Sequence, residues 1–170
     1  MQPLYILQAV DVRRADVEGT SRATTIAKMT IPKIEFASAT HNPGGGVMEV
    51  DYTLPRIKAL EPAFMAKGLD VEIFGELGAK GKWNFACAYR DTKTGKDVGM
   101  RGVIEGVPHL WEPDESDPED FQGCNHVFKE VTHFELVLGD EELWYIDAEE
   151  REIRRKGKSL TEDVRGALGA

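Results

Sequence analysis

The residues of this sequence best suited to metal binding are Cys124, His126 and His133, which lie close together and carry groups that bind zinc. A structural zinc site takes four ligands, usually in two close pairs. The sequence contains no second pair of this kind. We therefore predict no metal site.

The motifs of nucleophilic catalysis are also missing from the sequence. There is no Gly-x-Ser-x-Gly elbow, and neither Cys87 nor Cys124 lies in a known catalytic context. The histidines are scattered, without a carboxylate motif that would orient them. They are His41, His109, His126 and His133. The sequence therefore predicts no catalytic residues and no enzyme.

Two glycine-rich segments could in principle hold a phosphate group. A P-loop needs four residues between two glycines, followed by Lys and then Ser or Thr. In "GELGAKGKW", Gly75 and Gly81 are one residue too far apart, and Trp83 takes the place of the hydroxyl residue. The segment "NPGGGVME" has no Lys. We predict no nucleotide and no other cofactor, and interpret these glycines as loop residues.

The chain is acidic, with a formal net charge of −9 over 170 residues. Proteins that grip nucleic acid through its phosphates need clustered Lys and Arg, so this class is disfavoured. The segment "WEPDESDPEDF" lacks the glycine and the spacing of a calcium-binding EF-hand loop. We interpret it as a solvated acidic loop.

The sequence also lacks signals for membranes and export. The stretch "MQPLYILQAVDVRR" has a short apolar run and no basic leader, so it does not resemble a signal peptide. No apolar run is long enough to span a membrane. Two cysteines form no disulfide framework, which favours a reducing cytoplasm.

Most of the elements that the sequence predicts around these residues are strands. In "KWNFACAYRD", alternate residues share one apolar face, namely Trp83, Phe85, Cys87 and Tyr89. The segment "VGMRGVIEGV" is the expected partner strand, and its glycines predict close backbone approach or a bend. They are Gly99, Gly102 and Gly106. A meander then follows, with alternating "FKEVTHFELVL", "ELWYID" and "REIRR".

Helix signals are few. Leu69, Ile73 and Leu77 recur at four-residue spacing before Gly78 and predict a short helix at about 69–77. Near the end, Ser159 and Glu162 have the spacing of a capping box. The predicted fold is mainly β, a sandwich or barrel-like single domain over 1–170 with one or two short helices.

The order of these motifs resembles one family of structural proteins. "MTIPKIEF", the glycine-rich segment and "LEPAFMAKGLDVEIFGELG" resemble the front half of the major tail tube proteins of contractile-tail bacteriophages and R-type tailocins. "GVIEGV", an acidic loop and "FELVLGDEELWYIDAEEREIRRKGKSLTEDVRGALG" resemble the back half. The ending, with its strand, Gly139 turn and "VRGALG", is the most specific part.

The resemblance implies a structural subunit that forms hexameric rings stacked into a hollow tube inside a contractile sheath. The expected partners are other copies of the chain, the tail sheath protein, and baseplate and tail terminator proteins. Genomic DNA would pass through the lumen without specific binding. The expected location is the virion tail tube, assembled in the host cytoplasm.

The resemblance also implies that a hairpin arm at about 40–60 reaches a neighbouring subunit, and that the C-terminal meander and tail cover about 128–170. The alternation in "VMEVDY" suits such an arm, and we interpret the three glycines as its flexible joint. Deletion of 45–56 is then expected to leave a folded monomer. The residues expected to carry self-assembly are Asn42, Gly44, Gly45, Gly46, Met48, Val50, Tyr52, Val164, Arg165 and Leu168.

Two other functions remain open at this point. The tube of a type VI secretion apparatus has a similar fold, although the "VRGALG" ending and the motif order favour the phage proteins. A closed β-barrel could instead bind a small apolar ligand against the Trp83–Tyr89 face. We also expect Cys87 to be a small buried side chain and Cys124 to lie in a loop, exposed at a subunit interface.

Overall fold

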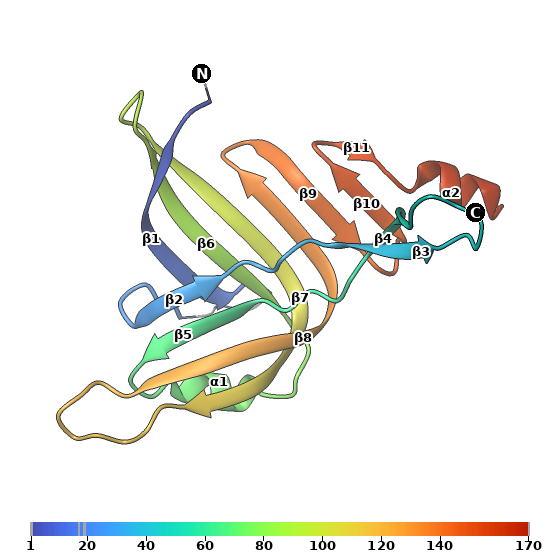
Figure 1. Ribbon diagram of the computed structural model, residues 1–170. Coiled ribbons are helices and arrows are strands. Elements are labelled where there is room, and N and C mark those ends of the chain that lie inside the picture. The colour runs from blue at the N-terminus through green and yellow to red at the C-terminus, as the bar shows by residue number, and fades with distance from the viewer. Residues whose placement is uncertain (1, 17, 19, 170) are drawn as a thin grey trace.

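The computed structural model describes residues 2–16, 18 and 20–169. Its fold is mainly β with two short helices, which confirms the predicted fold class (Figure 1). The elements are β1 (Tyr5–Arg14), β2 (Ile26–Thr30), β3 (Phe36–His41), β4 (Val50–Ile57), β5 (Ala63–Lys67), α1 (Val71–Glu76), β6 (Gly81–Asp91), β7 (Asp97–Pro113), β8 (Gly123–Leu138), β9 (Glu141–Asp147), β10 (Glu152–Arg155), β11 (Lys158–Ser159) and α2 (Glu162–Ala167).

One antiparallel sheet forms the body of the molecule. Its strands follow the order β1-β6-β7-β8-β9-β10-β11. The first part of the long strand β8 also pairs with β5, and β5 pairs with β2. Figure 1 shows the sheet bending so that β2 and β5 lie across one end of β1 and β6, with β1 beside β2. The result is a partly closed barrel from which β9, β10 and β11 extend.

The core lies between the bent parts of this sheet and is rich in aromatic side chains. Trp83, Phe85 and Phe128 are fully buried, and the Phe128 ring centroid lies 5.2 Å from that of Trp83 and 5.5 Å from that of Phe85. Both contacts are edge-to-face, which aromatic quadrupoles favour. The predicted apolar face of β6 is therefore confirmed for Trp83, Phe85 and Cys87, and its large rings fill the barrel by packing against each other.

The glycines of β7 differ in how closely the neighbouring strand approaches them. At Gly106 the register between β7 and β8 shifts, and Glu130 on β8 has a φ of 51°. A Cβ on Gly106 would come within 3.1 Å of the Lys129 carbonyl oxygen, whereas a Cβ on Gly99 would meet nothing within 4 Å. The predicted close approach is thus confirmed at Gly106, and Gly99 does not share it.

The substitution Gly106→Ala is expected to destabilise the fold, because the obstacle at 3.1 Å is backbone and moves only if the bend moves. The expected loss of unfolding free energy is about 1–3 kcal/mol, the usual cost of overpacking. Urea unfolding followed by tryptophan fluorescence measures it. Gly99→Ala on the same strand is the matched control, and an equal loss in both variants would contradict the steric explanation.

Cys124 lies within β8 and is 1% exposed, so the prediction of a loop position at a subunit interface is wrong. Its Sγ donates to the Gly68 carbonyl oxygen at 3.6 Å. The strand begins at Gly123, and the alternation of Cys124, His126 and Phe128 places all three side chains inside. The exposed acidic loop covers 114–122, between β7 and β8.

His126 is fully buried against Phe64, with the two ring centroids 4.7 Å apart. Neither ring nitrogen has a hydrogen-bond partner within the described part of the chain. Burial lowers the pKa of His126 below its ordinary value of 6.5; the Arg22 charge also lowers it, and the Asp70 charge acts in the opposite direction. The folded state therefore favours neutral His126.

The variant His126→Phe is expected to raise stability at neutral pH by about 1 kcal/mol, because it removes two unsatisfied polar atoms and keeps a ring against Phe64. In the wild type, stability should fall as the pH drops below about 6.5, since the unfolded chain then binds a proton that folded His126 resists. Chemical unfolding between pH 7.5 and 5 should show a flatter profile for the variant. The exposed His109→Gln change serves as the control, and an unchanged slope in His126→Phe would refute this assignment.

Both helices are short. In α1 only Ile73 of the three predicted apolar residues is buried, while Leu69 and Leu77 lie outside the helix and are 66% and 40% exposed. Asp70 caps α1 by accepting a hydrogen bond from the Ile73 backbone N–H. No helix in the described residues is long and apolar enough to cross a membrane.

Candidate self-assembly site

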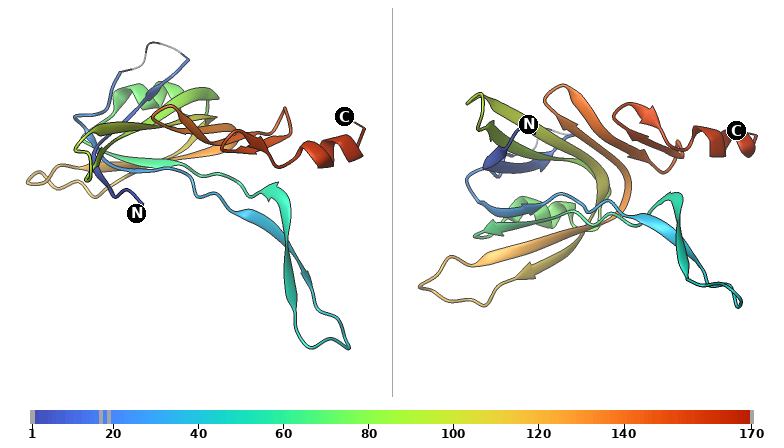
Figure 2. Two further views of the ribbon diagram at one scale, coloured as in Figure 1. Left: turned by 90° about the horizontal axis from the view of Figure 1, so that it is seen from above. Right: turned by 45° about the horizontal axis from the view of Figure 1, so that its top comes forward.

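The arm predicted from the sequence is a hairpin formed by β3 and β4, and we use "arm" for residues 36–57. Within the part of the chain that the structure describes, its strands pair only with each other, in a register that sets Ser38 opposite Thr53 and His41 opposite Val50. Figure 2 shows the arm projecting from the body as a separate two-stranded ribbon. The arm begins before the predicted position of about 40, because Phe36 already pairs with Ile57.

The three glycines lie at the tip of the arm and not at its junction with the body, so the interpretation of a flexible joint is wrong. Gly46 donates its N–H to the Pro43 carbonyl oxygen at 3.0 Å, which closes a turn. A Cβ on Gly46 would meet Pro43 Cγ at 2.4 Å, whereas Gly44 and Gly45 have open space around them. Among these three glycines, only Gly46 lies so close to a neighbouring residue that a side chain would not fit.

The tip of the arm exposes apolar side chains. Val47 is fully exposed, Met48 is 67% exposed, and Tyr52 is 57% exposed. The strand begins at Val50, so Met48 belongs to the tip loop and does not continue the predicted alternation. Two carboxylates, Glu49 and Asp51, lie beside these apolar residues, and Asn42 begins the tip loop.

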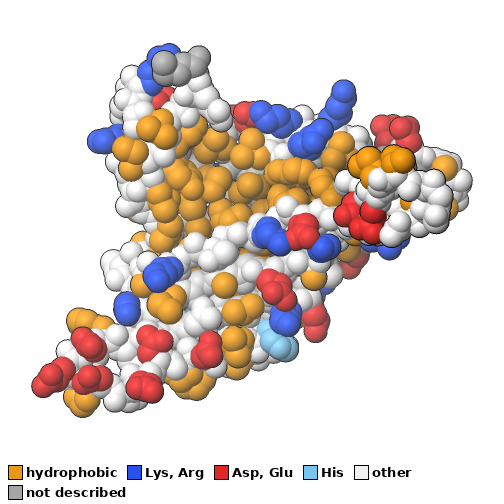
Figure 3. Space-filling view, viewed as in Figure 1, with side chains coloured by type: hydrophobic (Ala, Val, Ile, Leu, Met, Phe, Trp, Pro, Cys, Tyr) orange, Lys and Arg blue, Asp and Glu red, His pale blue; other side chains and the backbone are white. Residues whose placement is uncertain are grey.

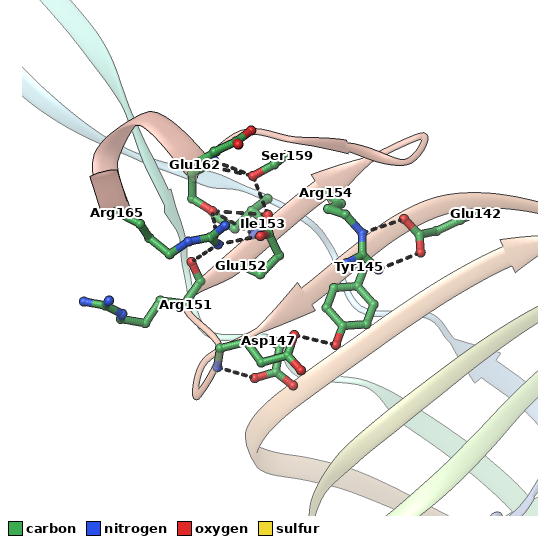
Figure 4. Close-up of polar contacts among 12 residues, drawn as sticks. Glu142, Tyr145, Asp147, Arg151, Glu152, Ile153, Arg154, Ser159, Glu162 and Arg165 are labelled. Carbon is green, nitrogen blue, oxygen red and sulfur yellow. Dashed lines mark hydrogen bonds and ion pairs between the residues drawn. The ribbon is translucent and has the colours of Figure 1, made fainter. Parts of the chain in front are cut away.

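The second predicted region, the C-terminal unit of β10, β11 and α2, is held by one carboxylate. Glu152 accepts hydrogen bonds from Ser159 Oγ at 2.6 Å and from Arg165 Nη1 (Figure 4). Arg165 also donates to the Arg151 carbonyl oxygen at 3.2 Å. Burial raises the pKa of Glu152, but the Ser159 bond and the Arg165 charge together lower it below its ordinary value. Arg165 therefore fixes α2 on its own chain.

The capping box predicted for α2 is half formed. Ser159 Oγ accepts a hydrogen bond from the Glu162 backbone N–H at 3.1 Å, as in such a box. The N-cap position itself is Thr161, and α2 begins at Glu162. The large apolar side chains of this segment are exposed, since Val164 is 43% and Leu168 is 72% exposed.

Beside this unit, an ion pair and a ring link the strands β9 and β10 (Figure 4). Arg154 donates two hydrogen bonds to Glu142, at 3.1 and 3.0 Å, and its guanidinium lies 3.9 Å from the Tyr145 ring centroid. Burial, followed by the hydrogen bond to Glu150, raises the pKa of Tyr145 to about 12. Sequence reasoning missed these residues, because no local pattern links Glu142 to Arg154.

A groove separates the base of the arm from α2. Its volume is about 470 Å³, within the usual range of protein binding pockets. The arm side contributes 55–60, the floor comes from 131–134, 146–148 and 151–153, and the helix side contributes Thr161, Val164, Arg165 and Leu168. The structure thus brings the three predicted C-terminal residues together with the base of the arm. The predicted tip residues are not part of this lining.

The sheet also leaves an apolar face partly uncovered. Residues paired across antiparallel strands share a face, and the pairs Cys87–Met100, Tyr89–Val98 and Leu136–Trp144 lie on the face that continues from the core. Figure 3 shows apolar side chains gathered over the hollow above β2. The opposite face carries Arg101 and Glu135 among small residues such as Ala86 and Ala88. Apolar patches left on a surface are typical of sites that contact another protein or a ligand.

The described residues hold no group of three or more His, Cys, Asp and Glu side chains placed to bind a metal ion. His133 Nδ1 lies 2.9 Å from a carboxylate oxygen of Asp147, away from the buried His126. Cys124 and His126 are thus buried on the inner face of β8, whereas His133 lies apart from them beside Asp147.

Comparison with known proteins identifies relatives of this architecture. A family model described as phage tail tube protein FII matches residues 10–169. In a search of solved structures, the fold is similar to a chain of the cryo-EM structure of the anti-feeding prophage (AFP) baseplate, six-fold symmetrised. The TM-score is 0.55 and the sequence identity is 7%, over 81% of this chain and 94% of that chain. A search of curated proteins found no match.

Proposed function

Because the chain belongs to the phage tail tube protein FII family, we propose that it assembles into hexameric rings that stack into the hollow tube of a contractile tail. The family is one of structural proteins, and the chain has a structural role in a phage tail tube as a component of the virion. Beyond this role, we propose the form of the polymer, the DNA that passes through it and the proteins that bind it.

The exposed arm is the feature of the structure that best supports this proposal. It is a hairpin that pairs with nothing else in the described chain and exposes Val47, Met48 and Tyr52 to solvent. The base of the arm packs on the body through Phe36 and Ile57, but the tip is exposed, so a neighbouring subunit is the natural source of contacts that order the tip. A contact between an arm and a different surface of the next copy is heterologous, and such contacts generate closed rings or open filaments.

The body supplies further surfaces for a polymer. The sheet is open, with β1 at one end of its strand order and the two-residue strand β11 at the other. Open edges can pair with strands of neighbouring copies. The apolar face beside the core is also left partly uncovered by the described residues, and a neighbouring copy could cover it. We propose six copies per ring because the structure of the similar AFP baseplate was symmetrised six-fold.

The lumen would be lined by a polar face of the sheet. The face with Arg101, Glu135, Ala86 and Ala88 has small side chains and mixed charges, and the chain as a whole carries −9. A net negative inner wall would repel phosphates and let DNA slide. The sheath, the baseplate and the tail terminator are the proposed further partners, and assembly would take place in the host cytoplasm.

Negative-stain electron microscopy of the purified protein tests the proposal. Rings or tubes of uniform diameter are expected, and a reconstruction of them would give the number of copies per ring and the charge of the inner wall. Uniform small monomers at all concentrations would refute self-assembly. A tube with a basic inner wall would refute free passage of DNA.

A further inference from the structure

We propose that the groove between the base of the arm and α2 is the docking site for the arm tip of a second copy. This inference rests on the proposed function, since it names the partner of each arm within the polymer. The occupant is a segment of the same chain, residues 42–51, presented by a neighbour.

Both walls of the groove carry apolar side chains. Ile57 and Leu60 line it from the arm side, and Val164 and Leu168 line it from α2. Leu168 is 72% exposed in the isolated chain, although its side chain borders a hollow of about 470 Å³. The exposed tip of the arm carries Val47 and Met48, which are apolar and small enough to enter such a hollow. Burying them there would remove apolar surface of both copies from water.

The charges of the two surfaces are complementary. The groove is lined by four cationic side chains, which are Arg56, Lys58, Arg151 and Arg165, and by two carboxylates, Asp147 and Glu152. Both carboxylates already have partners in their own chain, Asp147 with His133 and Glu152 with Arg165.

Within the described residues, Arg56 and Arg151 have no carboxylate at ion-pair distance, so the groove has a cationic excess. The arm tip carries the opposite charge, because Glu49 and Asp51 flank its apolar residues. Complementary charges of this kind set the orientation and the register of a contact.

The arm cannot fill the groove of its own chain. Residues 55–60 at the base of the arm form one wall of the groove, whereas the tip lies at the far end of the hairpin. β4 runs from Val50 to Ile57, and a strand rises about 3.3 Å per residue, which separates tip and base by roughly 20 Å. One tip and one groove on each copy therefore form a heterologous contact that repeats from copy to copy.

Charge reversal tests the docking. The groove variant Arg56→Glu with Arg151→Glu, and the arm variant Glu49→Arg with Asp51→Arg, should each reduce the sedimentable polymer at least tenfold. The protein with all four substitutions should regain polymer, because the charges are again complementary. Failure of the combined protein to recover, when the separate variants are folded by circular dichroism, would overturn the docking.

Disulfide trapping gives a second readout. Met48→Cys combined with Leu168→Cys should yield a ladder of cross-linked subunits on non-reducing gels after oxidation of the polymer. The native Cys87 and Cys124 are 6% and 1% exposed and leave the background low. Met48→Cys with Phe121→Cys, at an exposed site in the acidic loop, is the control and should give no ladder.

The outcomes separate the two proposals. Polymers that form normally but give no ladder from positions 48 and 168 would overturn the docking and leave the tube function standing. An equal ladder from positions 48 and 121 would also overturn the docking. A wild-type protein that forms no polymer would overturn the tube function itself.

Discussion

Shortening the arm is expected to abolish polymer formation and to leave the body folded. The body keeps its sheet because β3 and β4 pair only with each other. Its core residues, such as Trp83 and Phe128, lie outside the arm. What is lost is the tip, whose Val47 and Met48 are 102% and 67% exposed in the isolated chain. The expected effect is therefore complete loss of polymer with little change in stability.

The register of the hairpin defines the best variant. Ser38 lies opposite Thr53, so residues 39–52 can be replaced by Asn-Gly, a pair that favours a two-residue hairpin turn. This shortening is preferable to deletion of 45–56, which would remove most of β4 and leave β3 without a partner. It also keeps Phe36, whose ring centroid lies 6.2 Å from that of Trp144.

Sedimentation and electron microscopy at concentrations where the wild type is fully assembled measure the effect. Gly44→Ala with Gly45→Ala is the matched control in the arm, because both positions have open space for a Cβ and neither has a left-handed φ. This control should polymerise like the wild type. Tubes formed by the shortened protein would show that the arm is not the assembly element.

Arg22→Ala is expected to cause the largest loss of stability of any single substitution considered. Arg22 is 4% exposed, forms an ion pair with Asp70, and donates to the Val12 carbonyl oxygen at 3.4 Å. Its guanidinium also lies 5.4 Å from the Trp83 ring centroid and 5.8 Å from that of Phe64. Its removal leaves Asp70 largely buried without a counter-charge, which costs about 3 kcal/mol.

The loss should depend on pH in a defined direction. Burial raises the pKa of Asp70, but the hydrogen bond and charge of Arg22 outweigh it and lower the net pKa below 3.8. The stabilisation by the pair is therefore complete above the unfolded pKa and is lost as the pH falls through the folded pKa. The difference in unfolding free energy between the wild type and Arg22→Ala should therefore have its full size at pH 7 and should become smaller well below pH 3.8.

Urea unfolding followed by tryptophan fluorescence measures this difference. Arg13→Ala is the control, since Arg13 forms an ion pair with Asp11 but its side chain is 48% exposed, and its loss should cost no more than about 1 kcal/mol. The double variant Arg22→Met with Asp70→Ser removes both charges and keeps an oxygen to cap α1, so most of the loss should be recovered. If Arg22→Ala were as stable as Arg13→Ala, the pair would have no structural role.

Sequence patterns of short period were sufficient to predict the strands of the body. Trp83, Phe85 and Cys87 alternate, and they are buried together because successive side chains of a strand point to opposite faces. The same rule, applied to Cys124, His126 and Phe128, would have placed Cys124 inside. The alternation of these three residues is thus a local signal for a buried Cys124. The family could also be inferred from local motifs, because the order of the motifs along the chain can be read from the sequence without the tertiary contacts.

The positions of the glycines and of the groove were decided by the tertiary structure. "NPGGG" indicates a pliable turn, but whether that turn is the joint or the tip of a hairpin depends on which residues pair, and the pairing of Phe36 with Ile57 puts it at the tip. The groove joins 55–60, 146–153 and 161–168, and no periodicity relates such distant segments. Arg165 was predicted as an assembly residue from the resemblance of the C-terminal "VRGALG" segment to the family; its bond to Glu152 exists only because β10 and α2 fold against each other. Local patterns reflect the geometry of a single strand or turn, whereas contacts between distant segments depend on how the whole sheet bends.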